Sequence, residues 1–271
     1  MLPRLRRVFN FLFHSPPLLL AGVTLLAYGL LFAWLGFYWD EWPMTWIAHR
    51  LGPDGLARYF STNRPYWGMI YRLTTPLLGY VPWHWQLFGL FWRWVTAVAL
   101  WGTLRQVWPR HREPALWASL LFLVYPGFTQ QSIGMMYGHF FVVLSAYLLS
   151  LWCSLKAVRL RRDGPAPANT RAAAGLLLLA LLLSLVNLLA MEYFFILELL
   201  RAALIFALLR GEENAPPRWT RSLKPALLYS LPYVALFIGA ALWRAFFFRF
   251  QTQNYEIGLL DQIRAAPLAA L

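Results

Sequence analysis

Apolar runs long enough to cross a lipid bilayer are the feature that most constrains this chain. Hydrophobic residues make up 60% of the 271 residues and charged residues only 13%. Whole segments are apolar on every helix face, which suits lipid as the solvent. Hydropathy predicts about seven spans, near residues 16–38, 84–106, 114–127, 133–156, 172–190, 193–210 and 225–247. We therefore expect an all-α polytopic membrane protein with one transmembrane domain over residues 1–271.

The placement of arginine and lysine predicts how these spans are oriented. If the N-terminus is cytoplasmic, the inside segments carry most of the 24 cations, namely Arg4, Arg6, Arg7, Arg105, Arg110, Arg112, Lys156, Arg159, Arg161, Arg162, Arg171, Arg210, Arg218, Arg221 and Lys224. This is the positive-inside pattern, and it predicts a multi-pass protein of the plasma (inner) membrane. The net charge of +13 follows from this topology, so we expect no nucleic-acid partner.

Residues 39–83 then form a long extracytoplasmic loop. Apolar residues recur there at helical spacing, as at Leu56, Tyr59 and Phe60, which predicts two or three short amphipathic helices in the membrane interface. A second extracytoplasmic segment is expected to start at 248–271. Because its last residues, 265–271, look like the start of another helix, we expect the chain to be truncated at its C-terminus.

The adjacent carboxylates Asp40 and Glu41 are the strongest candidates for chemistry. They follow the first apolar run directly, a poor place for packing and a good one for reactions at the membrane surface. In the same loop, Arg58, Arg64 and Arg72 supply forked donors suited to a lipid phosphate. The alternative is a membrane-surface cover without any chemistry.

Other polar residues fall within or beside the predicted spans, where an ionisable group usually faces the bundle interior. Arg93, His139 and Glu192 are the candidates to line a cavity with the loop arginines. Glu198 and Arg201 are three residues apart and are interpreted as neutralising each other. Arg244 is expected only to extend toward the membrane surface. The candidates concentrate toward the outer leaflet, which favours a site that meets a lipid-linked substrate.

The order of these elements resembles the GT-C superfamily of membrane glycosyltransferases, including its protein O-mannosyltransferase-like members. The resemblance rests on the acidic pair within 38–42, on Asn63-Arg64-Pro65, on Pro126-Gly127-Phe128 with Gly138, and on the run 184–192. Met191 departs from the lysine that many relatives have there. The resemblance implies a polyprenyl-phosphate-linked sugar as donor and an acceptor hydroxyl, in contact with membrane lipids.

The resemblance also implies roles for the candidate residues. Asp40 would act as general base on the acceptor, and Glu41 would orient it or hold a divalent metal ion with Asp40. Arg64, with Arg58 or Arg72, would offset charge on the phosphate. Two alternatives remain at this stage: a lipid or small-molecule transporter, and a non-catalytic or truncated membrane scaffold.

Overall fold

A computed structural model describes residues 15–162, 167–211 and 219–248, and within these ranges the chain is helical and contains no strand. Its helices, in order, are α2 (Pro16–Thr24), the π-helix η1 (Leu25–Gly29), α3 (Glu41–Ser61), α4 (Pro65–Leu78), α5 (Pro82–Val107), α6 (Arg112–Leu123), α7 (Gly134–Arg162), α8 (Pro167–Ala190), the 3₁₀-helix η2 (Glu192–Leu199), α9 (Leu200–Gly211), α10 (Trp219–Leu242) and the π-helix η3 (Trp243–Phe247). The all-α expectation is confirmed for this part of the chain.

Among the described residues, four helical segments are long and apolar enough to cross a membrane: Pro82–Val107, Gly134–Arg162, Pro167–Ala190 and Ser222–Phe247. They coincide with four of the runs that hydropathy identified, and they indicate a membrane-embedded protein. The other three runs form shorter pieces. The first is helical only over Pro16–Gly29 and not through residue 38. The third is the 12-residue α6, about 18 Å long at 1.5 Å per residue.

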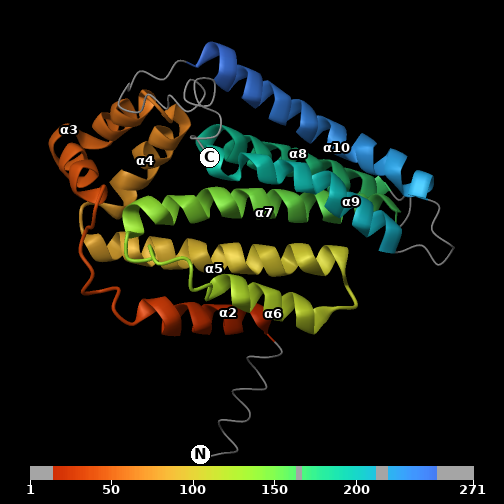
Figure 1. The fold of residues 1–271 in the computed structure, drawn as a ribbon, viewed down its shortest axis with the longest axis horizontal. Coiled ribbons are helices and arrows are strands. Elements are labelled where there is room, and N and C mark those ends of the chain that lie inside the picture. The colour runs from red at the N-terminus through yellow and green to blue at the C-terminus, as the bar shows by residue number, and fades with distance from the viewer. Residues whose placement is uncertain (1–14, 163–166, 212–218, 249–271) are drawn as a thin grey trace, which may run out of the picture.

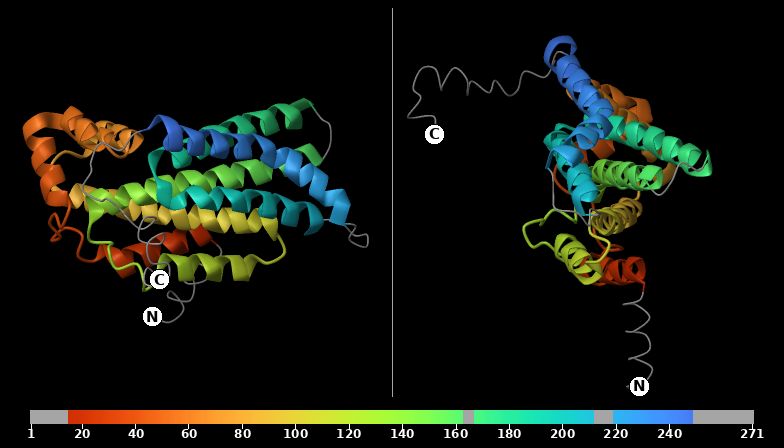
Figure 2. Two further views of the ribbon diagram at one scale, coloured as in Figure 1. Left: turned by 45° about the horizontal axis from the view of Figure 1, so that its top comes forward. Right: turned by 90° about the vertical axis from the view of Figure 1, so that its right-hand side faces the viewer.

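The helices form a layered bundle (Figures 1 and 2). The parallel pair α5 and α7 lies in the middle, with α2 and α6 on one side and α8, α9 and α10 on the other. Small residues let the central helices approach closely, since a Cβ on Gly134 would lie 2.9 Å from the Trp85 carbonyl oxygen. Thr96 and Ser145 share a hydrogen bond of 2.7 Å across this interface, a device typical of helices packed in lipid.

Residues 39–83 fold into a helical hairpin, α3 and α4, across one end of the bundle (Figure 1). Gly52, with φ of 69°, breaks α3 into two pieces, so the expected short helices are present. Gly68 lets the two helices touch, because a Cβ there would lie 2.9 Å from the Ala57 carbonyl oxygen. We call this end of the molecule the hairpin end.

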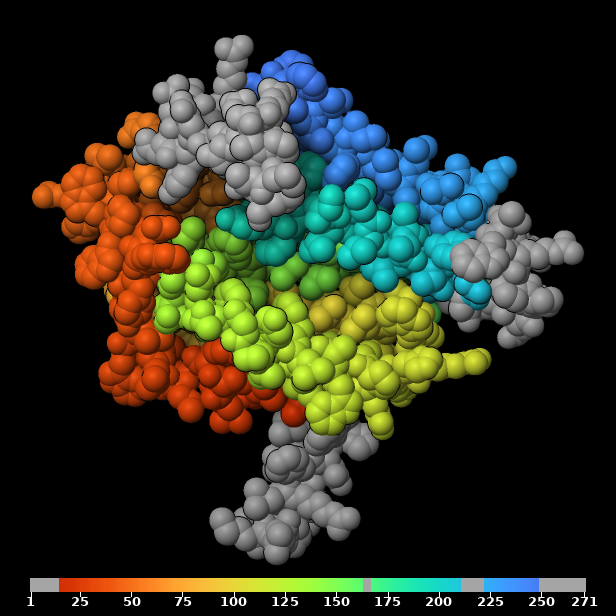
Figure 3. All heavy atoms as spheres, in the orientation of Figure 1, coloured from red at the N-terminus to blue at the C-terminus, as the bar shows by residue number. Residues whose placement is uncertain are grey.

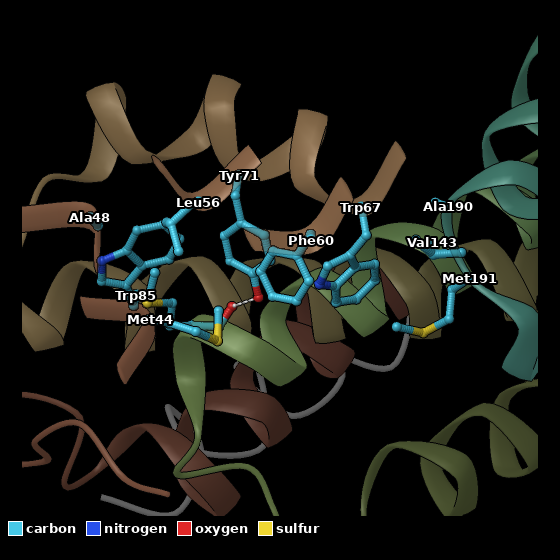
Figure 4. Close-up of a cluster of buried hydrophobic side chains, with 11 residues drawn as sticks. Met44, Ala48, Leu56, Phe60, Trp67, Tyr71, Trp85, Val143, Ala190 and Met191 are labelled. Carbon is cyan, nitrogen blue, oxygen red and sulfur yellow. Dashed lines mark hydrogen bonds between the residues drawn. The ribbon is translucent and has the colours of Figure 1, made fainter. Parts of the chain in front are cut away.

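A buried cluster fixes the hairpin on the bundle (Figure 4). Phe60 of α3 stacks on Tyr71 of α4 with ring centroids 5.1 Å apart, and the Tyr71 hydroxyl donates to the Met135 carbonyl of α7 at 3.2 Å. Trp85 of α5 and Met191 also belong to the cluster. The hairpin is therefore a packed part of the domain and holds the chain around Asp40 in place. The predicted second extracytoplasmic segment at 248–271 lies, beyond its first residue, outside the described residues.

Candidate functional site

Glu41 is buried and acts as an anchor. Its side chain is fully enclosed, and its carboxylate accepts hydrogen bonds from the backbone N–H groups of Met135 and Met136 at 2.5 and 3.1 Å. The Tyr38 N–H donates to its other oxygen at 3.0 Å. A carboxylate at the N-terminus of α7 complements the helix dipole. Burial raises the pKa of Glu41 to about 7, against the lowering effect of these three hydrogen bonds.

Asp40 is exposed, in contrast to its neighbour. Before it, Trp39 has a left-handed backbone with φ of 55°, a region that side-chain-bearing residues adopt at a cost. The turn sends the two carboxylates to different environments. The Asp40 carboxylate acts electrostatically on the hydroxyl of Tyr137 in the first turns of α7, so it lies on the side of the molecule where that helix starts.

Arg64 and Glu192 meet, although 128 residues separate them in the sequence. The Arg64 Nε lies 3.0 and 3.1 Å from the two Glu192 carboxylate oxygens, and its Nη2 donates to Oε1 as well. Arg244 Nη2 donates to Oε2 at 3.1 Å. We call these three residues the rim cluster. It carries two positive charges and one negative charge, and its side chains keep 19–35% of their surface exposed.

The charges in the rim cluster stabilise one another. Burial lowers the pKa of Arg64, but the hydrogen bonds and charge of Glu192 raise it above the ordinary value. Burial raises the pKa of Glu192, and the donors and charge of Arg64, aided by Arg244, hold it below the ordinary value. These shifts keep Arg64 and Glu192 ionised at neutral pH.

An aromatic groove of about 590 Å³ opens beside the rim cluster. It lies between α6, the segment that leads to α7, α7 itself and η2, and is lined by Arg93, Leu121, Phe122, Tyr125, Phe128, Gln130, Tyr137, Phe140, Phe141, Leu144, Tyr193 and Phe194. In the space-filling view the segment between α6 and α7 lies on the surface, between α2 and the teal helices (Figure 3). The groove is mainly apolar and suits a hydrocarbon ligand.

Tyr193 and Tyr137 join the groove to its polar mouth. The Arg64 guanidinium lies 5.8 Å from the centroid of the Tyr193 ring, and Tyr193 packs on Phe140 inside the groove at 5.4 Å. Tyr137, which Asp40 influences, packs on the same Phe140 at 4.8 Å. The structure thus brings Arg64, Glu192 and Arg244 to one groove mouth, and Asp40 is connected with it through its electrostatic effect on Tyr137.

Arg93 lines the deep part of the groove, where protein groups hold it. Its Nε donates to the Leu123 carbonyl at 3.0 Å and its Nη1 to the Gln131 side chain at 2.7 Å. Its Nη2 donates to the Tyr28 hydroxyl at 2.7 Å. Because Leu123 is the last residue of α6, Arg93 satisfies a free carbonyl at that helix end. These bonds tie α5 to α6 and η1.

The remaining sequence candidates lie away from the mouth. His139 is fully buried between the Met135 carbonyl and the Thr74 hydroxyl, at 2.7 and 2.9 Å, and it does not line the groove. Arg72 pairs with Asp54 at 2.7 Å on the exposed side of the hairpin. Arg58 is an exposed residue of the last turn of α3.

The acidic pair does not have the geometry of a joint metal site. The Glu41 carboxylate already accepts three backbone hydrogen bonds and lies in a buried setting, whereas Asp40 is exposed. Within the described part of the chain no group of three His, Cys, Asp or Glu side chains lies close enough to hold a metal ion. Asp40 and Glu41 are therefore assigned no shared metal ion.

A second ionic cluster lies deep in the bundle. Arg201 Nε donates to Glu198 at 2.7 Å, the Ser184 hydroxyl donates to the same oxygen at 2.8 Å, and Arg201 also contacts the hydroxyls of Ser150 and Ser154 at 2.9 Å each. We call these five residues the inner cluster. The pairing of Glu198 with Arg201 is the one that their spacing suggests.

Sequence reasoning missed the part of Arg244 in the rim cluster. It is the only cation within 225–247, and that isolation was the available signal. Its partner Glu192 lies 52 residues away, so the fold alone reveals the contact.

In comparisons with known proteins, no family model, curated protein or solved structure matches this chain.

Proposed function

We propose that this protein is a membrane glycosyltransferase that moves a sugar from a polyprenyl-phosphate-linked donor to an acceptor hydroxyl on the extracytoplasmic side. The observation that carries the proposal is the rim cluster at the mouth of the aromatic groove, together with the exposed Asp40 at the start of the hairpin. An apolar groove with cations at its mouth complements a ligand that has a long hydrocarbon tail and an anionic head. Such a ligand places its head at the membrane surface, where the hairpin lies.

Arg64 and Arg244 would hold the donor phosphate. Guanidinium groups match phosphate oxygens in pairs, and Glu192 keeps both side chains oriented before the ligand arrives. Arg72 has its own carboxylate partner on the far side of the hairpin, and we assign no role in the site to Arg58 or Arg72.

Asp40 would act as the general base. It accepts the proton of the acceptor hydroxyl while that oxygen attacks the anomeric carbon of the donor sugar. The bond from the anomeric carbon to the phosphate oxygen breaks, and the phosphate leaves with the electron pair. Arg64 and Arg244 offset the charge that develops on the leaving group. Glu41 takes no direct part in this mechanism and anchors the turn that presents Asp40.

The architecture that accompanies this proposal is GT-C-like. In it, three shorter helical units also cross the membrane: α2 with η1, α6 alone, and η2 with α9. Together with the four long helices they make seven membrane-crossing segments. The connections from α5 to α6 and from α7 to α8 are rich in arginine and lie at the end of the bundle opposite the hairpin. By the positive-inside rule that end is cytoplasmic, so the hairpin lies outside and the N-terminus lies inside. The arginine-proline element at Arg64 and Pro65 starts α4 and places Arg64 at the groove mouth.

Binding of the donor lipid in nanodiscs of phosphatidylcholine tests the proposal. We expect polyprenyl phosphate to bind the wild type, and Arg64→Ala to weaken binding by roughly tenfold or more, because charged hydrogen bonds contribute about 1.5–3 kcal/mol each. Arg72→Ala is the matched control and should bind like the wild type. Equal losses in the two variants, or no selectivity over phosphatidylglycerol, would remove the basis of the donor site.

A further inference from the structure

The aromatic groove is shorter than a long polyprenyl tail. Its lining on α7 runs from Tyr137 at the mouth to Leu144, which is about 10 Å along the helix at 1.5 Å per residue. An isoprene unit has one more chain bond than an amino-acid residue, whose extended reach is roughly 3.3–3.6 Å, so the unit spans about 4.5 Å. The length of the groove therefore matches about two isoprene units.

The deep end of the groove is closed by packed side chains. Leu144 packs against a buried core cluster, which consists of Ala99, Tyr147, Leu148 and Leu151. Beside it, the Arg93 guanidinium lies 3.8 Å from the centroid of the Tyr28 ring and donates to protein oxygens on the other side. A hydrocarbon chain cannot replace these hydrogen bonds, and a buried charge without them is costly. A tail in the groove therefore cannot continue past Leu144 and Arg93.

The long side of the groove is open. Leu121 and Tyr125 flank it at the end of α6 and are 68% and 61% exposed, and Tyr193 flanks it on η2 and is 61% exposed. Atoms of α7 reach the surface between these two flanks (Figure 3). Exposed apolar side chains on the outside of a membrane-embedded bundle contact lipid tails. The opening between α6 and η2 therefore faces the bilayer.

We propose that the protein recognises only the head-proximal part of the lipid tail, about two isoprene units, and that the rest leaves the groove sideways between α6 and η2 into the bilayer. The inference rests on the proposed function and adds which part of the donor the site reads. Arg64 and Arg244 hold the phosphate at the mouth, so the tail enters the groove from that end. Donors that share the head group and the first isoprene units are then equivalent, whatever their chain length.

A series of isoprenyl phosphates of increasing length tests this inference. Dimethylallyl, geranyl, farnesyl and geranylgeranyl phosphate, each one isoprene unit longer than the last, are compared with a long polyprenyl phosphate. Binding to the full chain is measured in nanodiscs of phosphatidylcholine, at matched concentrations of membrane-bound ligand. Affinity should rise roughly tenfold from dimethylallyl to farnesyl phosphate, because the added units gain aromatic contacts in the groove. From farnesyl to the long polyprenyl phosphate it should change by less than about twofold.

Two variants test the sideways exit. Leu121→Trp narrows the opening from an exposed position and should weaken the long polyprenyl phosphate while dimethylallyl phosphate binds as in the wild type. Leu178→Trp is the matched control, because Leu178 is 61% exposed on α8 and does not line the groove; it should bind the whole series like the wild type.

The outcomes separate this inference from the proposed function. Affinity that keeps rising beyond farnesyl phosphate, affinity that does not depend on length at all, or equal effects of Leu121→Trp and Leu178→Trp would overturn the inference alone, provided that Arg64→Ala weakens binding. If Arg64→Ala leaves the binding of every member of the series unchanged, the donor site itself is wrong, and the inference falls with it.

Discussion

The rim cluster and the inner cluster each pair a glutamate with arginine, but the first is partly exposed and the second is buried. Glu192 and Glu198 both lie on η2. A 3₁₀-helix has three residues per turn, so residues six apart share a face, about 12 Å apart along the axis. At the rim, Glu192 and its arginines keep 19–35% of their side chains exposed. Inside, Glu198 and Arg201 expose 2% and 1%.

This difference separates a pair that a ligand can reach from a pair that holds helices together. A partly exposed ion pair contributes about 1 kcal/mol or less to stability, so the rim cluster adds little to the stability of the fold and stays open to a ligand. The inner pair is enclosed by Ser150, Ser154 and Ser184 from α7 and α8. Its hydrogen bonds fix the packing of η2 and α9 against those helices.

The largest expected effect comes from breaking the inner pair. Glu198→Ala leaves the Arg201 guanidinium buried without its carboxylate, which destabilises a protein by roughly 3–5 kcal/mol. Thermal unfolding in detergent, followed by intrinsic tryptophan fluorescence, should show a large drop in Tm. Glu192→Ala is the matched control at the rim and should lower Tm only slightly. Equal drops in the two variants would abolish the distinction between the clusters.

A large effect on activity, without an effect on stability, is expected at the groove mouth. Asp40→Asn keeps the shape of an exposed side chain and removes the base, and general-base catalysis typically contributes about 10²–10⁴-fold. Sugar transfer from a polyprenyl-phosphate donor should fall by this range while Tm stays that of the wild type. Full transfer activity in Asp40→Asn would show that another group accepts the proton.

A smaller, pH-dependent effect is expected at Glu41, the carboxylate that is buried near the rim. Its pKa is raised to about 7 from an ordinary 4.5 because burial disfavours its charge. The folded state therefore binds the proton more tightly than the unfolded state, and its stability falls as pH rises from about 4.5 to about 7. Measured as the Tm of wild type minus that of Glu41→Gln, the difference should decline over this window. A rising difference would mean that the backbone hydrogen bonds to the carboxylate dominate.

The sequence was informative where a signal is local. Apolar length predicted four helices that are long enough to span a membrane, and helical spacing predicted the hairpin helices. Proline at the first turn marks the starts of α2, α4 and α5, as its fixed φ favours. The spacing of Glu198 and Arg201 indicated their pairing correctly.

The sequence was uninformative where a contact joins distant segments. Asp40 and Glu41 are adjacent and chemically alike, yet the left-handed Trp39 and the start of α7 give them opposite environments. Arg64 and Arg72 share a helix face pattern, but only the fold pairs one with Glu192 and the other with Asp54. The first run stops being helical at Gly29, in a π-helical turn where Tyr28 meets Arg93, which hydropathy does not register.

Photo-crosslinking with a polyprenyl phosphate that carries a photoreactive group in its tail tests the central claim most directly. The account predicts labelling of peptides from the groove, within residues 121–144 or at Tyr193 and Phe194. Unlabelled polyprenyl phosphate should compete with the label, and Arg64→Ala should reduce it. Labelling spread evenly over lipid-facing helices such as α8 and α10, and unchanged in Arg64→Ala, would contradict the claim that the rim cluster holds the lipid phosphate.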